Sequence, residues 1–446
     1  MLGGRALAAQ PSAKSWLQRW LAAFNAPDIA TYAAFVKTNI PDLAPYIDED
    51  LGVREASGGY DLLRSEETGA GEITAFVRDH NWGRFSKVVL SLDTHGISDV
   101  RFSGATDPRE AVLPRLGKAA GLKMLHAKLT TEATAKRFSG TVLIAQKDHV
   151  VMREAYGSVA GMRDPAASPN TRYCIGSMGK MFTAVGILQL VQRGRLQLTD
   201  TVGKLLSDYP DTSIARTVTV EHLLTHTGGT GDFFGPEYDR HAGELRTPAD
   251  FIRIFGRVEP AFPAGTRWGY SNLGFILLGA ILERVSGTSW DAYLAENVFR
   301  KADMSETGPL ATKENTAIPQ VGAAQTGLKP LPYYVGLPAG GGYSKVDDLN
   351  NFAMALAAGA LLDARHLALL TTAKVSAGSR NWSLGLTVAA RNGASFYGHG
   401  GSAPGVNADF AVYPRSGYTV IVLSNRGHPH AANPADFIGA RLPDRT

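Results

Sequence analysis

Ser177-Met178-Gly179-Lys180 opens an apolar helical pattern that continues to Val191. Residues three apart at a helix start lie on one face, so the Lys180 amine can reach the Ser177 hydroxyl. A serine hydroxyl becomes a nucleophile when a base takes its proton. Lysine is that base only when neutral, and burial beside the positive end of a helix lowers its pKa. The alternative is an N-cap serine followed by a surface lysine.

A second candidate motif, Tyr270-Ser271-Asn272, follows a stretch rich in Pro and Gly and precedes an apolar helix expected from Leu273. This position predicts a loop, from which Tyr270 can aim its hydroxyl into a cleft. Beside a lysine, a tyrosine acts as a phenolate base or as a proton relay. The non-catalytic interpretation is a partly buried tyrosine followed by an asparagine cap.

The third candidate motif is His399-Gly400-Gly401-Ser402, after a strand expected over 395–398. Two glycines let a substrate backbone approach closely. A backbone N–H at this edge can also face an oxyanion. The alternative interpretation is a glycine-rich strand end with a surface histidine.

These three motifs, in this order, resemble those of the serine hydrolases related to penicillin-binding proteins and class C β-lactamases. Two further stretches, 223–229 and 338–344, are similar to segments of that family. The resemblance covers residues 122–430. It implies a β-lactamase/transpeptidase-like domain of the α+β class, with an antiparallel sheet packed by helices beside a largely helical region.

The resemblance also implies a role for each motif residue. Ser177 is the expected acyl-forming nucleophile, and Lys180 and Tyr270 share the proton transfers. Asn272 either binds the substrate amide or holds Lys180. The substrate-binding and oxyanion group comprises His399, Gly400, Gly401 and Ser402, with the backbone N–H groups of Ser177 and Ser402 as oxyanion donors.

The third motif departs from the Lys-Thr-Gly that is usual in the β-lactamases of this family. A lysine there is a fixed positive charge suited to a carboxylate, whereas histidine is mostly neutral at pH 7. Gly400 also removes a hydroxyl. The departure disfavours efficient β-lactamase or carboxypeptidase action. It favours the esterase-like and aminopeptidase-like branches, among them the family VIII carboxylesterases and D-aminopeptidase-like enzymes.

Other chemistries lack their motifs. The sequence has no Gly-x-Ser-x-Gly, no Gly-x-x-x-x-Gly-Lys-Ser/Thr and no convincing dinucleotide fingerprint, so no cofactor is implied. Glu221 and His222 with His226 do not form His-Glu-x-x-His, and we expect a structural role for His226 and no metal. The single cysteine, Cys174, excludes an internal disulfide and is expected to be a packed small residue.

The composition is that of an ordinary globular protein: 446 residues, 44% hydrophobic and 19% charged. The net charge is +4, from 45 basic and 41 acidic residues. No Lys/Arg-rich run is long enough for a nucleic-acid patch. The apolar runs are shorter than the roughly 18–20 residues of a membrane span. We therefore expect neither nucleic acid nor a membrane span.

Residues 15–110 predict a small α+β accessory domain. Aromatic residues recur at helical spacing from Trp16 to Phe24, and a second helix passes through Tyr32. Its element order resembles the cone-shaped domains similar to nuclear transport factor two, which implies a homodimer through this domain or a cap that narrows substrate size. Strands are expected over 60–64, 73–77, 85–92 and 100–102, with Val88 and Leu90 on the apolar face of the third.

We interpret residues 111–121 as a linker and 122–446 as the hydrolase domain. A sheet assembled from both ends of this domain is expected, with a helix-rich middle over 177–310. Residues 1–14 are a disordered terminus or the remainder of an export signal, which favours a periplasmic or secreted location over a cytoplasmic one. The flanking elements are a helix over 122–133, a hairpin of 140–146 and 150–156, and strands at 395–398, 408–413 and 419–424.

The sequence thus predicts a serine hydrolase that forms an acyl-enzyme, with small esters as the leading substrate class. Amides or peptides of D-amino acids are the alternative, and slow β-lactam hydrolysis is the third. A hypothesis of another class is a penicillin-binding sensor that acylates and stalls, or a binding module without turnover.

Overall fold

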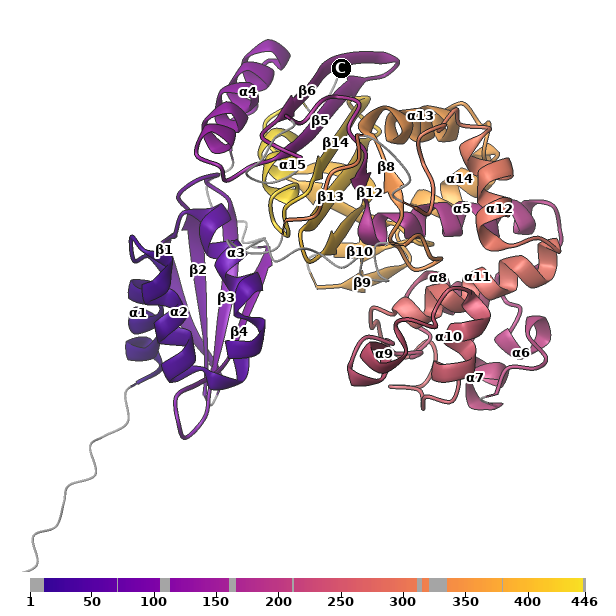
Figure 1. Ribbon diagram of the computed structural model, residues 1–446, viewed down its shortest axis with the longest axis horizontal. Helices are drawn as coiled ribbons and strands as arrows, with labels where there is room; N and C mark the ends of the chain where they lie inside the picture. Colours follow the sequence, from indigo (N-terminus) through magenta and orange to yellow (C-terminus); the bar gives the residue numbers. More distant parts are fainter. Residues whose placement is uncertain are drawn as a thin grey trace, which may run out of the picture. The chain divides into compact units, whose positions relative to one another are not determined.

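The computed structural model describes residues 12–69, 71–104, 113–159, 166–210, 212–310, 315–320, 335–378 and 380–443 (Figure 1). The chain divides into two compact units, Met1–Ala111 and Val112–Thr446. Each unit has its own cluster of buried apolar side chains.

The first unit places its helices before a four-stranded sheet, as the sequence predicts. Trp20 and Phe24 stack at 4.9 Å and pack against Tyr32, in a core that also buries Val88 and Leu90. The helices are α1 (Ala13–Phe24), α2 (Ile29–Asn39), the 3-10 helix η1 (Pro41–Tyr46) and α3 (Ile47–Ser57). The antiparallel strands, in spatial order, are β1 (Tyr60–Gly69), β2 (Glu72–Asp79), β3 (Phe85–Leu92) and β4 (Ile97–Gly104).

This unit begins earlier than predicted. The Ser12 hydroxyl accepts the Ser15 N–H and caps α1, so Ala13 and Lys14 are helical and the prediction that 1–14 lies outside the fold is wrong for these two residues. Residues 1–11, which hold the predicted export signal, lie outside the described residues. The homodimer, the cap and the likeness to nuclear transport factor two stay predictions.

The second unit is built on an eight-stranded antiparallel sheet drawn from both ends of its sequence. The strand order is β6-β5-β14-β13-β12-β11-β10-β9, so that β5 from the start of the unit pairs with β14 from its end. The strands are β5 (Gly140–Gln146), β6 (His149–Tyr156), β9 (Val375–Ala377), β10 (Arg380–Trp382), β11 (Thr387–Arg391), β12 (Ala394–Ala403), β13 (Val406–Tyr413) and β14 (Tyr418–Ser424).

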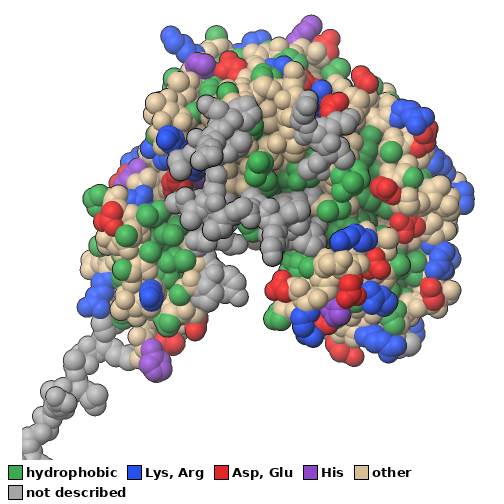
Figure 2. Space-filling view, viewed as in Figure 1, with side chains coloured by type: hydrophobic (Ala, Val, Ile, Leu, Met, Phe, Trp, Pro, Cys, Tyr) green, Lys and Arg blue, Asp and Glu red, His purple; other side chains and the backbone are tan. Residues whose placement is uncertain are grey.

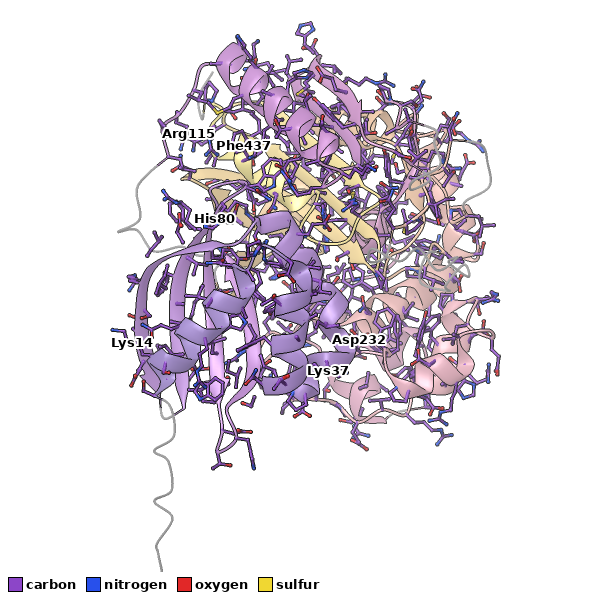
Figure 3. The ribbon with its side chains drawn as sticks, turned by 60° about the vertical axis from the view of Figure 1, so that its left-hand side comes forward. Lys14, Lys37, His80, Arg115, Asp232 and Phe437 are labelled. Atoms are coloured by element: carbon purple, nitrogen blue, oxygen red, sulfur yellow. The ribbon has the colours of Figure 1, made fainter. Side chains whose placement is uncertain are left out.

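Helices cover this sheet on both faces. On one face α15 (Ala432–Gly439) packs on β13 and β14 beside α4 (Lys118–Thr134), and α13 (Val346–Ala357) packs on β14 and β5 from the other (Figure 1). Helix α4 begins inside the predicted linker. Arg115, which lies near Phe437 of α15 in Figure 3, donates to the carbonyls of Gly439 and Leu442 and so ties this stretch to the unit.

The helical region comes from the middle of the chain, and its two most buried helices are α5 (Lys180–Gln192) and α11 (Asn272–Ser286). No helix in the described part of the chain is long and apolar enough to cross a membrane. On the face in Figure 2, acidic and basic side chains are interspersed over this region. Its remaining elements are α6 (Val202–Leu205), α7 (Thr212–Thr217), α8 (Val220–Leu224), α9 (Pro236–His241), α10 (Pro248–Phe255), α12 (Trp290–Leu294), the π-turn η4 (Ala295–Phe299) and α14 (Ala364–Thr371).

Candidate active site

Ser177 lies in the 3-10 turn η3 (Gly176–Gly179), between the short strand β7 (Tyr173–Cys174), which pairs with β8 (Tyr343–Ser344), and helix α5. Strand β12 packs closely against this turn. A Cβ added to Gly401 would lie 1.8 Å from the Ile175 carbonyl oxygen and 3.3 Å from the Ser177 nitrogen. A Cβ on Gly176, whose φ is 51°, would lie 3.0 Å from the Ser402 nitrogen. The glycines therefore permit the two backbone N–H groups to approach each other.

Lys180 is the first residue of α5, and its side chain is fully buried. Its Nζ lies 3.3 Å from Ser177 Oγ and 2.7 Å from Asn272 Oδ1, and it also contacts the Ala339 carbonyl oxygen. Burial lowers the pKa of Lys180 from 10.5 to about 7. A neutral amine has two N–H donors and one lone pair. Because Asn272 Oδ1 and the Ala339 oxygen can only accept, they take both N–H groups, and the lone pair faces Ser177.

Asp232 fixes the orientation of Asn272. The Nδ2 of Asn272 donates to Asp232 Oδ2 at 2.8 Å, which leaves its Oδ1 toward Lys180. The Asp232 carboxylate also acts to raise the pKa of Lys180, against the larger effect of burial. Ser271 caps α11 by accepting the Gly274 N–H, so Asn272 is the first residue of the helix and not the end of a loop. Asp232 has no signal in the sequence, because a single carboxylate after a glycine-rich turn matches no motif.

Tyr270 lies beside Lys180 in the same site. Lys180 Nζ is 4.9 Å from the Tyr270 ring centroid. Burial raises the pKa of the Tyr270 phenol, so the phenol keeps its proton at neutral pH. Of the two predicted roles, a phenol that keeps its proton favours a proton relay and not a phenolate base.

His226 packs against Tyr270 and binds the backbone of the next residue. Its ring lies 4.4 Å from that of Tyr270 and 5.0 Å from that of Trp382, and its Nδ1 accepts the Ser271 N–H at 3.1 Å. Burial lowers the pKa of His226 well below its usual range, so this histidine is neutral. Trp382 and Trp268, which stack at 5.6 Å, complete the wall and have no motif in the sequence.

His399 lies within β12, and the prediction that its motif follows the end of a strand is wrong. Pairing with β13 continues through Ala403, which keeps 399–402 in the sheet. Alternate residues of a strand share a face, so His399 points to the same side as Gly401, toward the Ser177 turn. Its ring packs edge-on against Trp382 at 5.5 Å. Burial and the nearby Lys180 lower the pKa of His399 to about 3, so it carries no charge.

The tautomer of His399 follows from its contacts. Its Nδ1 lies 2.5 Å from the Gly400 carbonyl oxygen, which can only accept, so Nδ1 carries the proton. Its Nε2 is then a lone-pair acceptor, and it is buried with no hydrogen-bond partner among the described residues.

The other candidate features lie elsewhere. A cavity of about 170 Å³ borders Gly179, Phe182 and Trp290, and neither Ser177 nor Lys180 lines it. Across the described residues, no three His, Cys, Asp or Glu side chains gather as a metal site. Cys174 is buried and free.

Comparison with known proteins identifies the family of the second unit. The family model described as Beta-lactamase matches residues 126–443. The chain belongs to this family. Membership covers the unit that contains Ser177, Lys180 and Tyr270, and with it the β-lactamase/transpeptidase-like fold that the sequence predicts is confirmed.

Three known proteins illustrate the similarity of this chain to others. The putative penicillin-binding protein PbpX of Bacillus subtilis (strain 168) is 28% identical over 291 residues, which are 64% of this chain and 70% of PbpX. The crystal structure of a penicillin-binding protein from Bacillus halodurans is 30% identical, with a TM-score of 0.62 over 71% of this chain and 98% of that one. A D-stereospecific amidohydrolase from a Streptomyces species is 26% identical, with a TM-score of 0.58 over 74% and 99%.

Proposed function

We propose that this beta-lactamase-family protein hydrolyses small carboxylic esters through an acyl-enzyme on Ser177. The observation that carries the proposal is the environment of Lys180. Its pKa of about 7 and its two carbonyl-type acceptors leave a lone pair facing the nucleophile 3.3 Å away. A base with a pKa near the working pH is the most effective at neutral pH.

The reaction has two half-steps. Lys180 takes the Ser177 proton while Oγ attacks the ester carbonyl. The resulting oxyanion accepts hydrogen bonds from the backbone N–H groups of Ser177 and Ser402. The carbon–oxygen bond to the alcohol then breaks, and the protonated Tyr270, resupplied by the Lys180 ammonium, donates a proton to the leaving alkoxide. Water then attacks the acyl carbonyl with Lys180 again as base. The bond between the acyl carbon and Ser177 Oγ breaks, the Lys180 ammonium returns a proton to Oγ, and the carboxylic acid leaves.

His399 supports esters over substrates that carry a carboxylate beside the scissile bond. A neutral imidazole whose Nε2 lone pair is unpartnered among the described residues cannot neutralise a carboxylate, and two acceptors repel each other. We therefore expect uncharged esters to be better substrates than β-lactams or peptides cleaved next to a free carboxylate.

The same lone pair favours a second candidate, amides of D-amino acids. An amino-acid amide carries an ammonium or amine donor next to the scissile carbonyl, and His399 Nε2 is an acceptor without a partner among the described residues. The similarity to a D-stereospecific amidohydrolase supports this candidate as well.

A hydrolysis panel tests the proposal, with the parent protein and Ser177→Ala side by side. It contains p-nitrophenyl acetate and butyrate, D- and L-alanine p-nitroanilides, and nitrocefin. Ester turnover that disappears in Ser177→Ala supports the esterase, and Ser177-dependent turnover of the D-anilide alone supports the amidase. An acyl adduct whose mass does not decay would identify a penicillin-binding sensor, and full activity in Ser177→Ala would refute the mechanism.

A further inference from the structure

The oxyanion donor on β12 belongs to a peptide unit whose other end is held by a buried side chain. The Ser402 N–H and the Gly401 carbonyl share one trans peptide, so the two groups point in opposite directions. Strand β11 pairs with β12 only over Ala394–Gly398, which leaves the following residues without a partner strand on that edge. The Ser402 nitrogen lies close to the Ser177 turn, since a Cβ added to Gly176 would be 3.0 Å from it.

On the opposite edge, β12 meets β13, where Ser402 lies across from Asn407. The side-chain Nδ2 of Asn407 donates to the Gly401 carbonyl oxygen at 3.0 Å. Pinning this oxygen toward β13 turns the Ser402 N–H toward Ser177. The orientation of this peptide plane thus rests on the pairing of β12 with β13 and on one additional side-chain hydrogen bond.

Asn407 is itself locked. It is 3% exposed, and its Oδ1 accepts the N–H groups of Ala431 at 2.6 Å and Ala432 at 3.0 Å. These donors belong to the chain that leads into α15. Because the carbonyl end of the amide is fixed by two donors, its NH₂ end can only face Gly401.

We propose that Asn407 is a positioning residue that aims the Ser402 N–H into the oxyanion hole, an inference that rests on the proposed acyl-enzyme mechanism. An oxyanion donor is effective because it is oriented before charge develops. A small rotation of this peptide therefore reduces the stabilisation of the transition state more than it reduces the binding of the substrate. Asn407 touches neither the substrate nor the nucleophile and acts through the Gly401–Ser402 peptide.

Asn407→Asp keeps the contacts made by one end of the side chain and removes the contact made by the other. A carboxylate still accepts the Ala431 and Ala432 N–H groups but repels the Gly401 carbonyl. Asn407→Ala removes the donor without adding charge. The matched control is Asn425→Asp, at an equally buried asparagine whose Nδ2 donates to the carbonyls of Ser158 and Ile318.

The assay is steady-state ester hydrolysis with inhibition by phenylboronic acid, which forms a tetrahedral adduct on serine. For both Asn407 variants we expect kcat to fall about 10- to 100-fold, with KM within about threefold of the parent and the boronate Ki raised in proportion to kcat/KM. The acid limb of the pH profile, set by Lys180, should stay near pH 7. Melting curves establish that each variant is folded.

Equal losses of kcat in Asn407→Ala and Asn425→Asp would overturn the proposal, as would a boronate Ki that does not change. Retention of the parent kcat in both Asn407 variants would overturn it too. Ser177→Ala in the same assay keeps the two ideas apart: activity without Ser177 refutes the acyl-enzyme, whereas loss in Ser177→Ala with normal Asn407 variants refutes only the positioning role.

Discussion

Replacing Asp232 by asparagine should move the acid limb of the pH–rate profile to lower pH. Only neutral Lys180 accepts the Ser177 proton, so kcat/KM in the parent rises as pH passes through about 7. The Asp232 carboxylate stabilises the ammonium form of Lys180. Removing that charge lowers the pKa of Lys180, and a larger fraction of the enzyme is then active at pH 6.

The magnitude follows from the geometry of the Lys180–Asn272–Asp232 chain. Two hydrogen bonds, of 2.7 Å and 2.8 Å, join the amine to the carboxylate through one amide group. The charges are therefore about 7 Å apart, and Coulomb's law gives about 0.6 kcal/mol at water's dielectric constant and about 2.4 kcal/mol at a value of 20. Because Asp232 is exposed, we expect the lower half of this range, a midpoint lower by about 0.5–1 pH unit.

The assay is kcat/KM for an uncharged p-nitrophenyl ester between pH 5 and 9. For each enzyme, kcat/KM at pH 6 is divided by its value on the high-pH plateau. This ratio should be about three to five times larger for the variant than for the parent. Asparagine at 232 can still accept the Asn272 amide, so the plateau should be retained. The matched control is Asp208→Asn, which removes a surface carboxylate paired with Arg284 and should leave the midpoint unchanged. A midpoint that rises, or that moves equally in both variants, would refute the reasoning.

Three further outcomes are expected. In ester kinetics, Gly401→Ala should lower kcat at least about 100-fold, because its Cβ would collide with the Ile175 carbonyl. Gly400→Ala is the control and should be tolerated, because its Cβ meets only the Ala408 oxygen at 3.5 Å. Lys180→Met should abolish turnover yet add about 1–3 kcal/mol of stability at pH 6, since the native state no longer buries an amine. That gain should shrink in melting curves from pH 7 to 10, where native Lys180 is neutral while the unfolded chain stays protonated. His399→Lys should raise nitrocefin hydrolysis relative to ester hydrolysis in the same panel, because a cation then faces the carboxylate.

Local patterns were enough to predict the ordered motifs and several of the elements. The 3.6-residue spacing after Ser177 predicts α5 and places Lys180 one turn from the hydroxyl, and the structure has both. Alternation over 85–92 predicts β3 with Val88 and Leu90 inside, because a half-buried strand repeats every two residues. These features depend on neighbours in the chain, so the sequence alone determines them.

Boundaries set by distant contacts were beyond the sequence. The sequence ends a strand at 398, yet β12 continues to Ala403 because β13 pairs with it throughout. The predicted linker loses its last residues to α4, and Arg115, which precedes that helix, binds carbonyls more than 300 positions away.

The electrostatics of the site also needed the tertiary structure. A Ser-x-x-Lys pattern does not reveal that Lys180 is fully buried, that Asn272 and the Ala339 carbonyl take its protons, or that Asp232 partly offsets its desolvation. The pKa of a buried amine depends on the groups that surround it in space, and here those groups come from three stretches of the chain that are distant from Lys180 in sequence. For the same reason, only the fold brings Asn407 to the peptide that carries the oxyanion donor.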